Sequence, residues 1–335
     1  MSKTALDYLW ADMDSFSPFV PLLPKQVQEI WDFGPNPAIL PLIKCPPPAE
    51  WGLFDVYAYR IRPRDDYLDC ALYQRLAFIR TGINPFPRLL SLQCYLLHPL
   101  TLGVKIFPSS LRCLSLYPEY TSVLDDRAEL ALRQAAQDAP FLEELCISAI
   151  YRLHLGAKLR PLGFKKLHTV QLIANVLRPD FQNFSCLLST SPIRNLGISL
   201  CSSLDVSFRL GGAGGLPDTF PHLEMITIRD VKIHLDHFAS ISAYGRFFKL
   251  LAERRPPVHF IEVRMGRVCV GRRSEYVRGF LATLEPLVDA GLVGLKVEMP
   301  LYGAWKVEED IKKRLRPEAW PSLACFEFML TEASR

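Results

Sequence analysis

Apolar residues recur along most of the chain at positions 1, 4 and 6 of a six-residue spacing, with mostly polar residues between them. The stretch FPHLEMITI at residues 220–228 is typical, because Leu223, Ile226 and Ile228 occupy these three positions. We call each such stretch a frame and number its positions 1 to 6. Nine frames begin at Leu89, Leu111, Leu142, Leu167, Ile193, Leu223, Val258, Leu292 and Leu323. A recurrence of this kind indicates a repeat protein, in which each unit packs against its neighbours.

The spacing predicts a short parallel strand in each frame, led in by a turn. Position 1 enters from the turn, positions 4 and 6 point into the core, and the residues between them face outward. In the frame at Leu223 the outward residues are Glu224, Met225 and Thr227. Six frames have a proline one to three residues upstream, at Pro87, Pro108, Pro140, Pro192, Pro221 and Pro321.

Successive frames start 22 to 35 residues apart, mostly more than the roughly 20–29 residues of regular leucine-rich repeats. The extra length leaves room for a helix between strands, and a helix between two strands favours parallel pairing. The pattern therefore predicts an α/β fold. We expect an irregular leucine-rich-repeat solenoid, with parallel strands on the concave side, helices on the convex side and a short helical segment at the N-terminus.

Apolar periodicity and proline positions predict where the helices lie. We expect helices at residues 2–14, 49–60, 67–79, 125–138, 179–189, 238–253, 276–290 and 310–315, the seventh kinked or ended near Pro286. Residues 15–24 break the first helix, and residues 25–48 are expected to form an irregular, proline-rich connector. The glycine-rich residues 211–215 are expected to form a loop.

Composition adds little to this picture. The chain has 335 residues, a net charge of +4 and 22% charged residues, so neither a nucleic acid nor a membrane is expected as its partner. No secretory signal or membrane-spanning stretch is evident, which predicts a soluble, cytoplasmic or nuclear protein. The nine cysteines lack C-x-x-C pairs and are expected to be free thiols. Four of them lie inside frames, where we expect them to fill the core: Cys94, Cys113, Cys146 and Cys325.

Catalytic signatures are weak. The glycine run lacks the Lys-Ser or Lys-Thr of a phosphate-binding loop. His234 and His237 flank Asp236 but have no further pair of metal ligands. Asp65 and Asp66 fit a solvated turn. We therefore expect no enzyme, catalytic residue, metal or cofactor, and look for function on a surface.

Basic residues are concentrated between Arg246 and Arg278, a stretch that contains nine arginines and lysines but only three glutamates. The candidate partner-binding residues are Arg264, Arg267, Arg272 and Arg273, which lie in or beyond the strand expected at Val258. Arginines in that position could bind a carboxylate-rich or phosphorylated protein bidentately. The alternative is a solvated cationic surface without a dedicated partner.

The first part of the chain resembles a known family. Residues 5–24 read ALDYLWADMDSFSPFVPLLP, residues 51–62 read WGLFDVYAYRIR and residues 86–96 read FPRLLSLQCYL. These stretches are similar to the region that follows the F-box in F-box and leucine-rich-repeat proteins of mushroom-forming fungi. The resemblance is strongest over the first 92 residues and looser over the rest.

The resemblance implies the substrate-recognition part of an SCF-type ubiquitin ligase, which holds a protein substrate and has no active site. It places the end of an F-box at residues 1–24, with Leu6, Leu9 and Trp10 as its remnant. Residues 25–85 would be a connector with capping helices, and residues 86–335 the repeat array. Most of the F-box is missing, which suggests a shortened gene model or a relative that has lost the adaptor-binding half. A Skp-type adaptor is expected as a partner only if an F-box lies upstream. The alternative is a free-standing leucine-rich-repeat scaffold outside ubiquitination.

Overall fold

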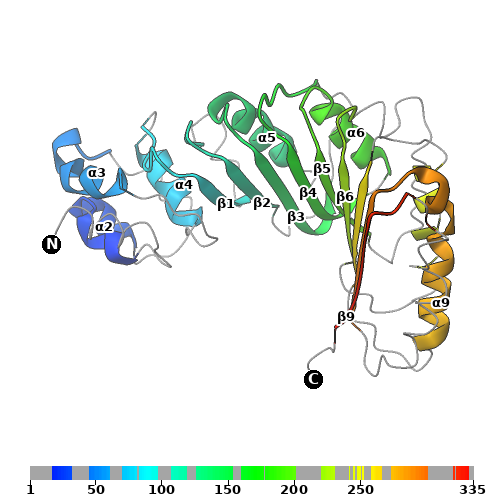
Figure 1. The fold of residues 1–335 in the computed structure, drawn as a ribbon. Helices are drawn as coiled ribbons and strands as arrows, with labels where there is room; N and C mark the ends of the chain where they lie inside the picture. The colour runs from blue at the N-terminus through cyan, green and yellow to red at the C-terminus, as the bar shows by residue number, and fades with distance from the viewer. Residues whose placement is uncertain are drawn as a thin grey trace. The chain divides into compact units, whose positions relative to one another are not determined.

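A computed structural model describes residues 17–31, 45–60, 70–80, 83–96, 107–118, 126–153, 160–176, 178–200, 220–230, 241, 244–245, 247–249, 251–252, 258–265, 273–300, 320 and 322–331. The chain, drawn in Figure 1, divides into two compact units. The first comprises residues 1–148 and 162–167, and the second comprises residues 149–161 and 168–335. The helices predicted at residues 2–14 and 310–315 and the glycine-rich loop lie outside the described residues.

The first unit begins with short helices: η1 (Ser17–Leu22), α2 (Lys25–Trp31), η3 (Pro48–Trp51), α3 (Gly52–Ala58) and α4 (Cys70–Ile79). The helices predicted at residues 49–60 and 67–79 correspond to η3 with α3 and to α4. The prediction of an irregular stretch from residue 25 was wrong over α2. The carbonyl of Pro24 accepts hydrogen bonds from the backbone N–H groups of Val27 and Gln28, so the proline lies just before the helix. A proline there costs no helical hydrogen bond, because the first N–H groups of a helix have no partner within it.

Aromatic side chains form the core of this helical part. Five of them lie almost fully buried: Phe19, Trp51, Phe54, Tyr73 and Phe86. The Trp51 and Phe54 rings meet edge to face with centroids 5.6 Å apart, and Phe54 lies 5.6 Å from Phe86. Such aromatic pairs contribute about 0.5–1.5 kcal/mol beyond their burial. This packing joins the helices to the turn that leads into the first strand.

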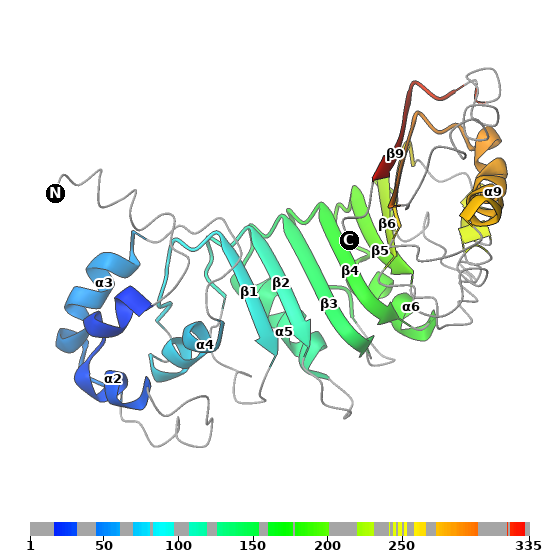
Figure 2. The same cartoon turned by 90° about the horizontal axis from the view of Figure 1, so that it is seen from below.

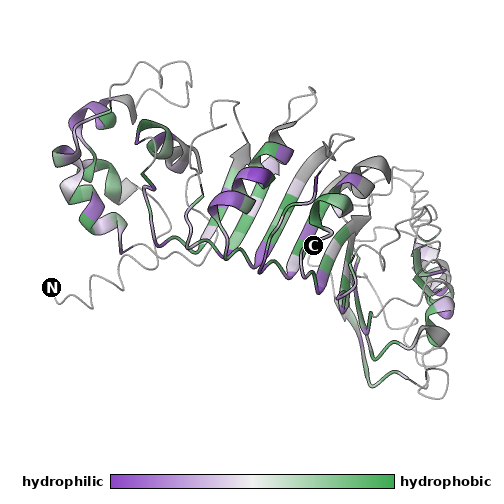
Figure 3. Cartoon of the chain, turned by 90° about the horizontal axis from the view of Figure 1, so that it is seen from above, coloured by the Kyte–Doolittle hydropathy of each residue, from purple (hydrophilic) through white to green (hydrophobic). Residues whose placement is uncertain are grey.

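The first unit continues with β1 (Ser91–Leu96), β2 (Cys113–Pro118), α5 (Asp126–Asp138) and residues 144–148 of β3 (Glu144–Leu153). These strands pair in parallel, β1 with β2 and β2 with β3. The helix α5 buries Ala128, Leu132 and Ala135, and it exposes Gln137 together with Leu130. Both hydrophobic and hydrophilic residues occur along it (Figure 3). The helix predicted at residues 125–138 is confirmed.

The second unit contains β4 (Thr169–Val176), α6 (Arg178–Leu188), β5 (Asn195–Leu200), β6 (Met225–Asp230), β7 (Phe260–Arg264), α9 (Arg273–Thr283), η5 (Glu285–Ala290), β8 (Gly294–Pro300) and β9 (Cys325–Thr331). Each strand from β4 to β9 pairs in parallel with the next. Helices α6 and α9 lie on the same side of these strands (Figure 2). The described positions between 241 and 252 are helical. The expected end of a helix near Pro286 is confirmed, since α9 stops before it and the shorter η5 follows.

The inward positions of the frames are confirmed. In the first eight frames, positions 1, 4 and 6 are all buried. The strands align frame by frame, so that position 4 faces position 4. Leu196 of β5 pairs with Ile226 of β6, which pairs with Ile261 of β7. Identical alignment in both units gives each core an unbroken apolar row, which fixes the register because a slip by one residue would expose that row.

The backbone between frames repeats as well. In three frames a buried aromatic residue precedes the proline and its carbonyl accepts the N–H of position 1, as between Phe220 and Leu223. Proline favours the second place of such a turn, because its φ angle is fixed near the required value. At position 2 of a frame, the backbone carbonyl accepts hydrogen bonds from two N–H groups of the following frame. The carbonyl of Glu224, for example, accepts from His259 and Phe260. The same shared acceptor occurs at Leu90, Arg112, His168, Arg194, His259 and Val293.

The cysteines of the frames correct one prediction. Cys94 occupies position 6 and is buried, as expected for core filling. Cys113 and Cys146 occupy outward positions and are only partly buried, while Cys325 is exposed. Their position within the frame decides their burial. The cysteines that the structure describes are all free thiols. Among the described residues, no helix combines the length and the apolar character needed to cross a membrane.

Candidate binding surface

The outward side chains of the second unit form a polar row across its strands. Position 5 of successive frames carries Gln171, Gly197, Thr227, Glu262, Lys296 and Glu327, on β4 to β9 in order. We call this set the position-5 row. Its neighbours on the inward side are apolar in every frame, so these polar residues are not required for the core. Its exposed and partly exposed side chains can contact a partner, whereas Glu262 is buried.

An ionic network occupies the part of the row on β7, β8 and β9. The Glu262 carboxylate accepts a hydrogen bond from Arg264 Nε at 3.0 Å and lies 4.0 Å from Lys296 Nζ. Lys296 Nζ in turn lies 3.2 Å from Glu327 Oε2, and Arg264 Nε lies 3.9 Å from Glu298 Oε2. Glu262 is buried, whereas the other members reach solvent. The network therefore holds its charges in fixed places at the surface.

A small hollow occupies the part of the row on β4, β5 and β6. Its volume is about 40 Å³, and it is lined by Thr169, Gln171, Ile173, Asn195, Leu196, Gly197, Ile198 and Thr227. Glycine at position 197 lets the side chain of Gln171 pack closely over it, because a Cβ there would lie only 3.2 Å from Cγ of Gln171. Thr227 joins the hollow to the ionic network, since its hydroxyl donates to Glu262 Oε2 at 3.4 Å. Hollow and network are thus continuous on one surface.

The predicted arginine site is only partly described. Arg264 lies on β7 with its guanidinium at the surface, but it is already engaged by Glu262 and Glu298. Arg267 and Arg272 lie outside the described residues, and Arg273 begins α9 without a described side chain. The grouping of these four arginines stays a prediction. Leu6, Leu9 and Trp10, predicted as the F-box remnant, also lie outside the described residues, as do His234, His237, Asp65 and Asp66.

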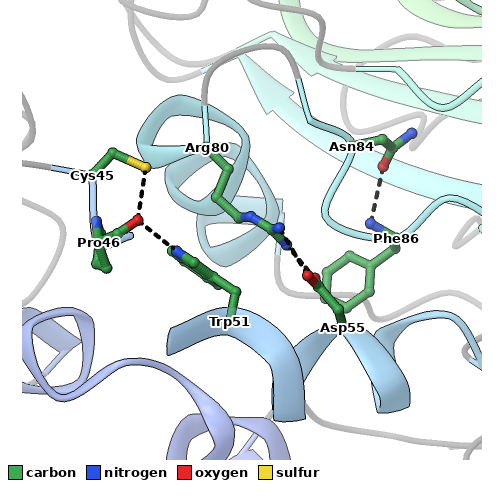
Figure 4. Close-up of polar contacts among 7 residues, drawn as sticks. All are labelled: Cys45, Pro46, Trp51, Asp55, Arg80, Asn84 and Phe86. Atoms are coloured by element: carbon green, nitrogen blue, oxygen red, sulfur yellow. Dashed lines mark hydrogen bonds and ion pairs between the residues drawn. The ribbon is translucent and has the colours of Figure 1, made fainter. Parts of the chain in front are cut away.

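A second polar cluster lies in the first unit, between α3 and α4 (Figure 4). The Arg80 guanidinium forms a two-pronged ion pair with Asp55 and lies 4.5 Å from the centre of the Trp51 ring. Trp51 Nε1 donates to the carbonyl of Pro46 at 3.2 Å. Arg80 and Trp51 are both almost fully buried. Because its arginine and tryptophan are buried, we assign this cluster to holding the helices together.

The frame pattern contains a signal for the position-5 row that the local charge pattern does not. Aligning the frames brings Glu262, Lys296 and Glu327 to one position, and Glu262 and Arg264 stand two residues apart in one strand. Residues with this spacing share a face. The hollow had no such signal, because it depends on how Gln171 leans over Gly197 from the next strand.

Comparisons with known proteins give no independent family assignment. No family model matches the chain, and no curated protein matches it.

Proposed function

We propose that the chain is a protein-binding module, built as an irregular leucine-rich-repeat solenoid whose outward strand faces hold the partner. The aligned apolar rows and the shared backbone acceptors between frames support this assignment. Stacked repeats of this type present extended surfaces for protein recognition. The partner is a protein, because a row of six strands spans roughly 24 Å at about 4.8 Å per strand, more than a small molecule covers.

The position-5 row carries the proposal. Four of its residues, Thr227, Glu262, Lys296 and Glu327, are held by contacts with one another, and they add no apolar burial to the core. Side chains held in fixed positions lose little further entropy when a partner binds. The resemblance of the first 92 residues to F-box proteins adds a role, in which the module recognises substrates for an SCF-type ubiquitin ligase.

Site-specific photo-cross-linking tests the binding surface. A benzophenone amino acid is placed at Thr227 in the position-5 row and, in a matched variant, at Gln137 on α5, an exposed site of the first unit. After irradiation in an extract of the source cells, we expect discrete protein adducts at position 227 that excess unlabelled wild-type chain suppresses. Equal adducts at positions 137 and 227, or none at 227, would refute the proposed surface.

The ubiquitin-ligase role and the free-standing scaffold are separated by a second measurement. Purified chain is mixed with a Skp-type adaptor and analysed by size-exclusion chromatography. A stoichiometric complex favours the ligase role, whereas separate elution of the two proteins at micromolar concentration favours the scaffold.

A further inference from the structure

The hollow over Gly197 offers unused hydrogen-bonding groups. Asn195 Nδ2 donates to Thr169 Oγ1 at 3.1 Å, which leaves the amide oxygen of Asn195 as an acceptor. The side chain of Gln171 makes no hydrogen bond to any residue that the structure describes, so its amide keeps both a donor and an acceptor. Two amide side chains thus line the hollow at neighbouring strands, with Gly197 as its floor.

The charge of the lining restricts what can enter. None of the residues that line the hollow is ionised. The Glu262 carboxylate, which accepts a hydrogen bond from Thr227 at the edge of the hollow, is already paired with Arg264 and Lys296. A charged side chain in the hollow would lose hydration without gaining an opposite charge, which is costly, while an apolar one would leave the amides unpaired. The best occupant is therefore neutral and forms hydrogen bonds.

We propose that the hollow receives a carboxamide side chain, asparagine or glutamine, from an extended segment of the protein partner; this rests on the proposed binding function. A carboxamide has an oxygen that accepts and an NH₂ group that donates. Its NH₂ group would donate to Asn195 Oδ1, and its oxygen would accept from Gln171 Nε2. The incoming side chain would lie beside Gln171, which itself packs over Gly197.

A displayed library of random twelve-residue peptides tests this inference. It is selected on the full chain, and enriched peptides are synthesised and their affinities measured by fluorescence anisotropy. We expect the enriched sequences to share an asparagine or glutamine. Replacing that residue by leucine or aspartate should weaken binding about tenfold, as expected when buried polar groups lose their partner.

The variant Gln171→Glu supplies a sharper test, because it keeps the shape of the side chain but removes the donor and adds a negative charge. It should weaken binding of the selected peptides about tenfold, and a new selection on it should favour lysine or arginine at the same place. The matched control Gln137→Glu on α5 makes the same change of charge and should leave binding unchanged. Circular dichroism spectra verify that both variants are folded.

The outcomes separate this inference from the proposed function. Peptides that bind the wild type, lose binding with Thr227→Arg and show no carboxamide preference would overturn the inference and leave the binding surface intact. Peptides that bind Thr227→Arg as tightly as the wild type, or the absence of any enriched sequence, would also overturn it. Whether the position-5 row is the binding surface is then decided by the cross-linking experiment at position 227.

Discussion

The Glu262 carboxylate lies 3.0 Å from Arg264 Nε on the same strand, with the glutamate side chain 8% exposed and the arginine side chain 44% exposed. A buried carboxylate is thus held by a cation that water still reaches. The arginine can be solvated without its partner, while the glutamate would be buried alone without the arginine. The two halves of this ion pair therefore differ in what their removal costs.

Replacing Glu262 with glutamine should lower the free energy of unfolding by about 1–2 kcal/mol, because charge-assisted hydrogen bonds from Arg264 are lost. Urea denaturation gives this value. Glu327→Gln is the control, since that carboxylate is about half exposed and such surface pairs contribute roughly 0–1 kcal/mol. Equal losses in the two variants would show that burial of Glu262 adds nothing.

Ile226 and Thr227 are neighbours on β6 that face opposite sides. Ile226→Ala should lower the free energy of unfolding by about 2–5 kcal/mol, because Ile226 is fully buried and alanine leaves a cavity. Thr227→Ala should cost less than about 1 kcal/mol, since its hydroxyl makes one long hydrogen bond at 3.4 Å. Both values come from urea denaturation of purified variants. Similar losses would contradict the assignment of inward and outward positions.

Asp55 compensates the buried charge of Arg80 in the first unit. Asp55→Ala should destabilise α3 and α4 by about 2–3 kcal/mol, less than the roughly 3–5 kcal/mol of a fully buried pair because Asp55 is half exposed. The loss of local stability is measured by hydrogen exchange of the α3 and α4 backbone amides, followed by mass spectrometry.

The double variant Asp55→Ala with Arg80→Met tests the cause of that loss. It removes the unpaired charge and keeps an apolar chain over Trp51, so it should recover part of the protection. A double variant that exchanges faster than Asp55→Ala alone would contradict this explanation. Glu50→Gln is the control for loss of an exposed acidic charge nearby.

Burial raises the pKa of the Cys113 thiol from its ordinary value of 9.0 to about 11, with further contributions from the carboxylates of Glu144 and Glu143. At pH 8 this shift lowers the thiolate fraction about a hundredfold, so alkylation by iodoacetamide should be slow. Glu144→Gln should accelerate the reaction at Cys113, and Glu327→Gln should not. Mass spectrometry of the labelled peptides gives the rates.

The same shift has a consequence for stability. The folded state keeps the Cys113 proton to higher pH than the unfolded state, which releases it near pH 9. The contribution of the protonated Cys113 thiol to the free energy of unfolding is therefore complete below pH 9, and it is lost as the pH rises from 9 towards 11. A Cys113→Ser variant should lose less stability across this range in urea denaturation. An identical pH profile would contradict the raised pKa.

The strands could be predicted because their signal is local. Leu223, Ile226 and Ile228 are spaced as a turn and a strand require, and the same spacing recurs often enough to fix the pairing. The short helix α2 was missed because its seven residues follow several prolines and carry little periodicity. Cys325 was assigned to the core by residue type, although its place at position 3 of the frame turns it outward.

The candidate surface was harder to predict, because its contacts join residues far apart in the chain. Lys296 meets Glu262 and Glu327 only when three frames are aligned in register. The hollow depends on side-chain conformation in addition to register. Local sequence patterns determine neither the contacts between frames nor the side-chain conformations. The local charge pattern therefore predicts the arginines near Arg264 as the site and gives no sign of the amides beside Gly197.

The shared backbone acceptors described above make the joint between frames independent of side chains. The carbonyl of Glu224 would accept from His259 and Phe260 whichever residues stood at those three positions, proline excepted at the donors. Most outward residues of one strand can therefore be exchanged while the strands on either side keep their pairing. Gly294 is an exception, because a Cβ there would clash with the Phe260 ring on the neighbouring strand. A library that varies positions 2, 3 and 5 of neighbouring frames would redesign the recognition surface without redesigning the scaffold.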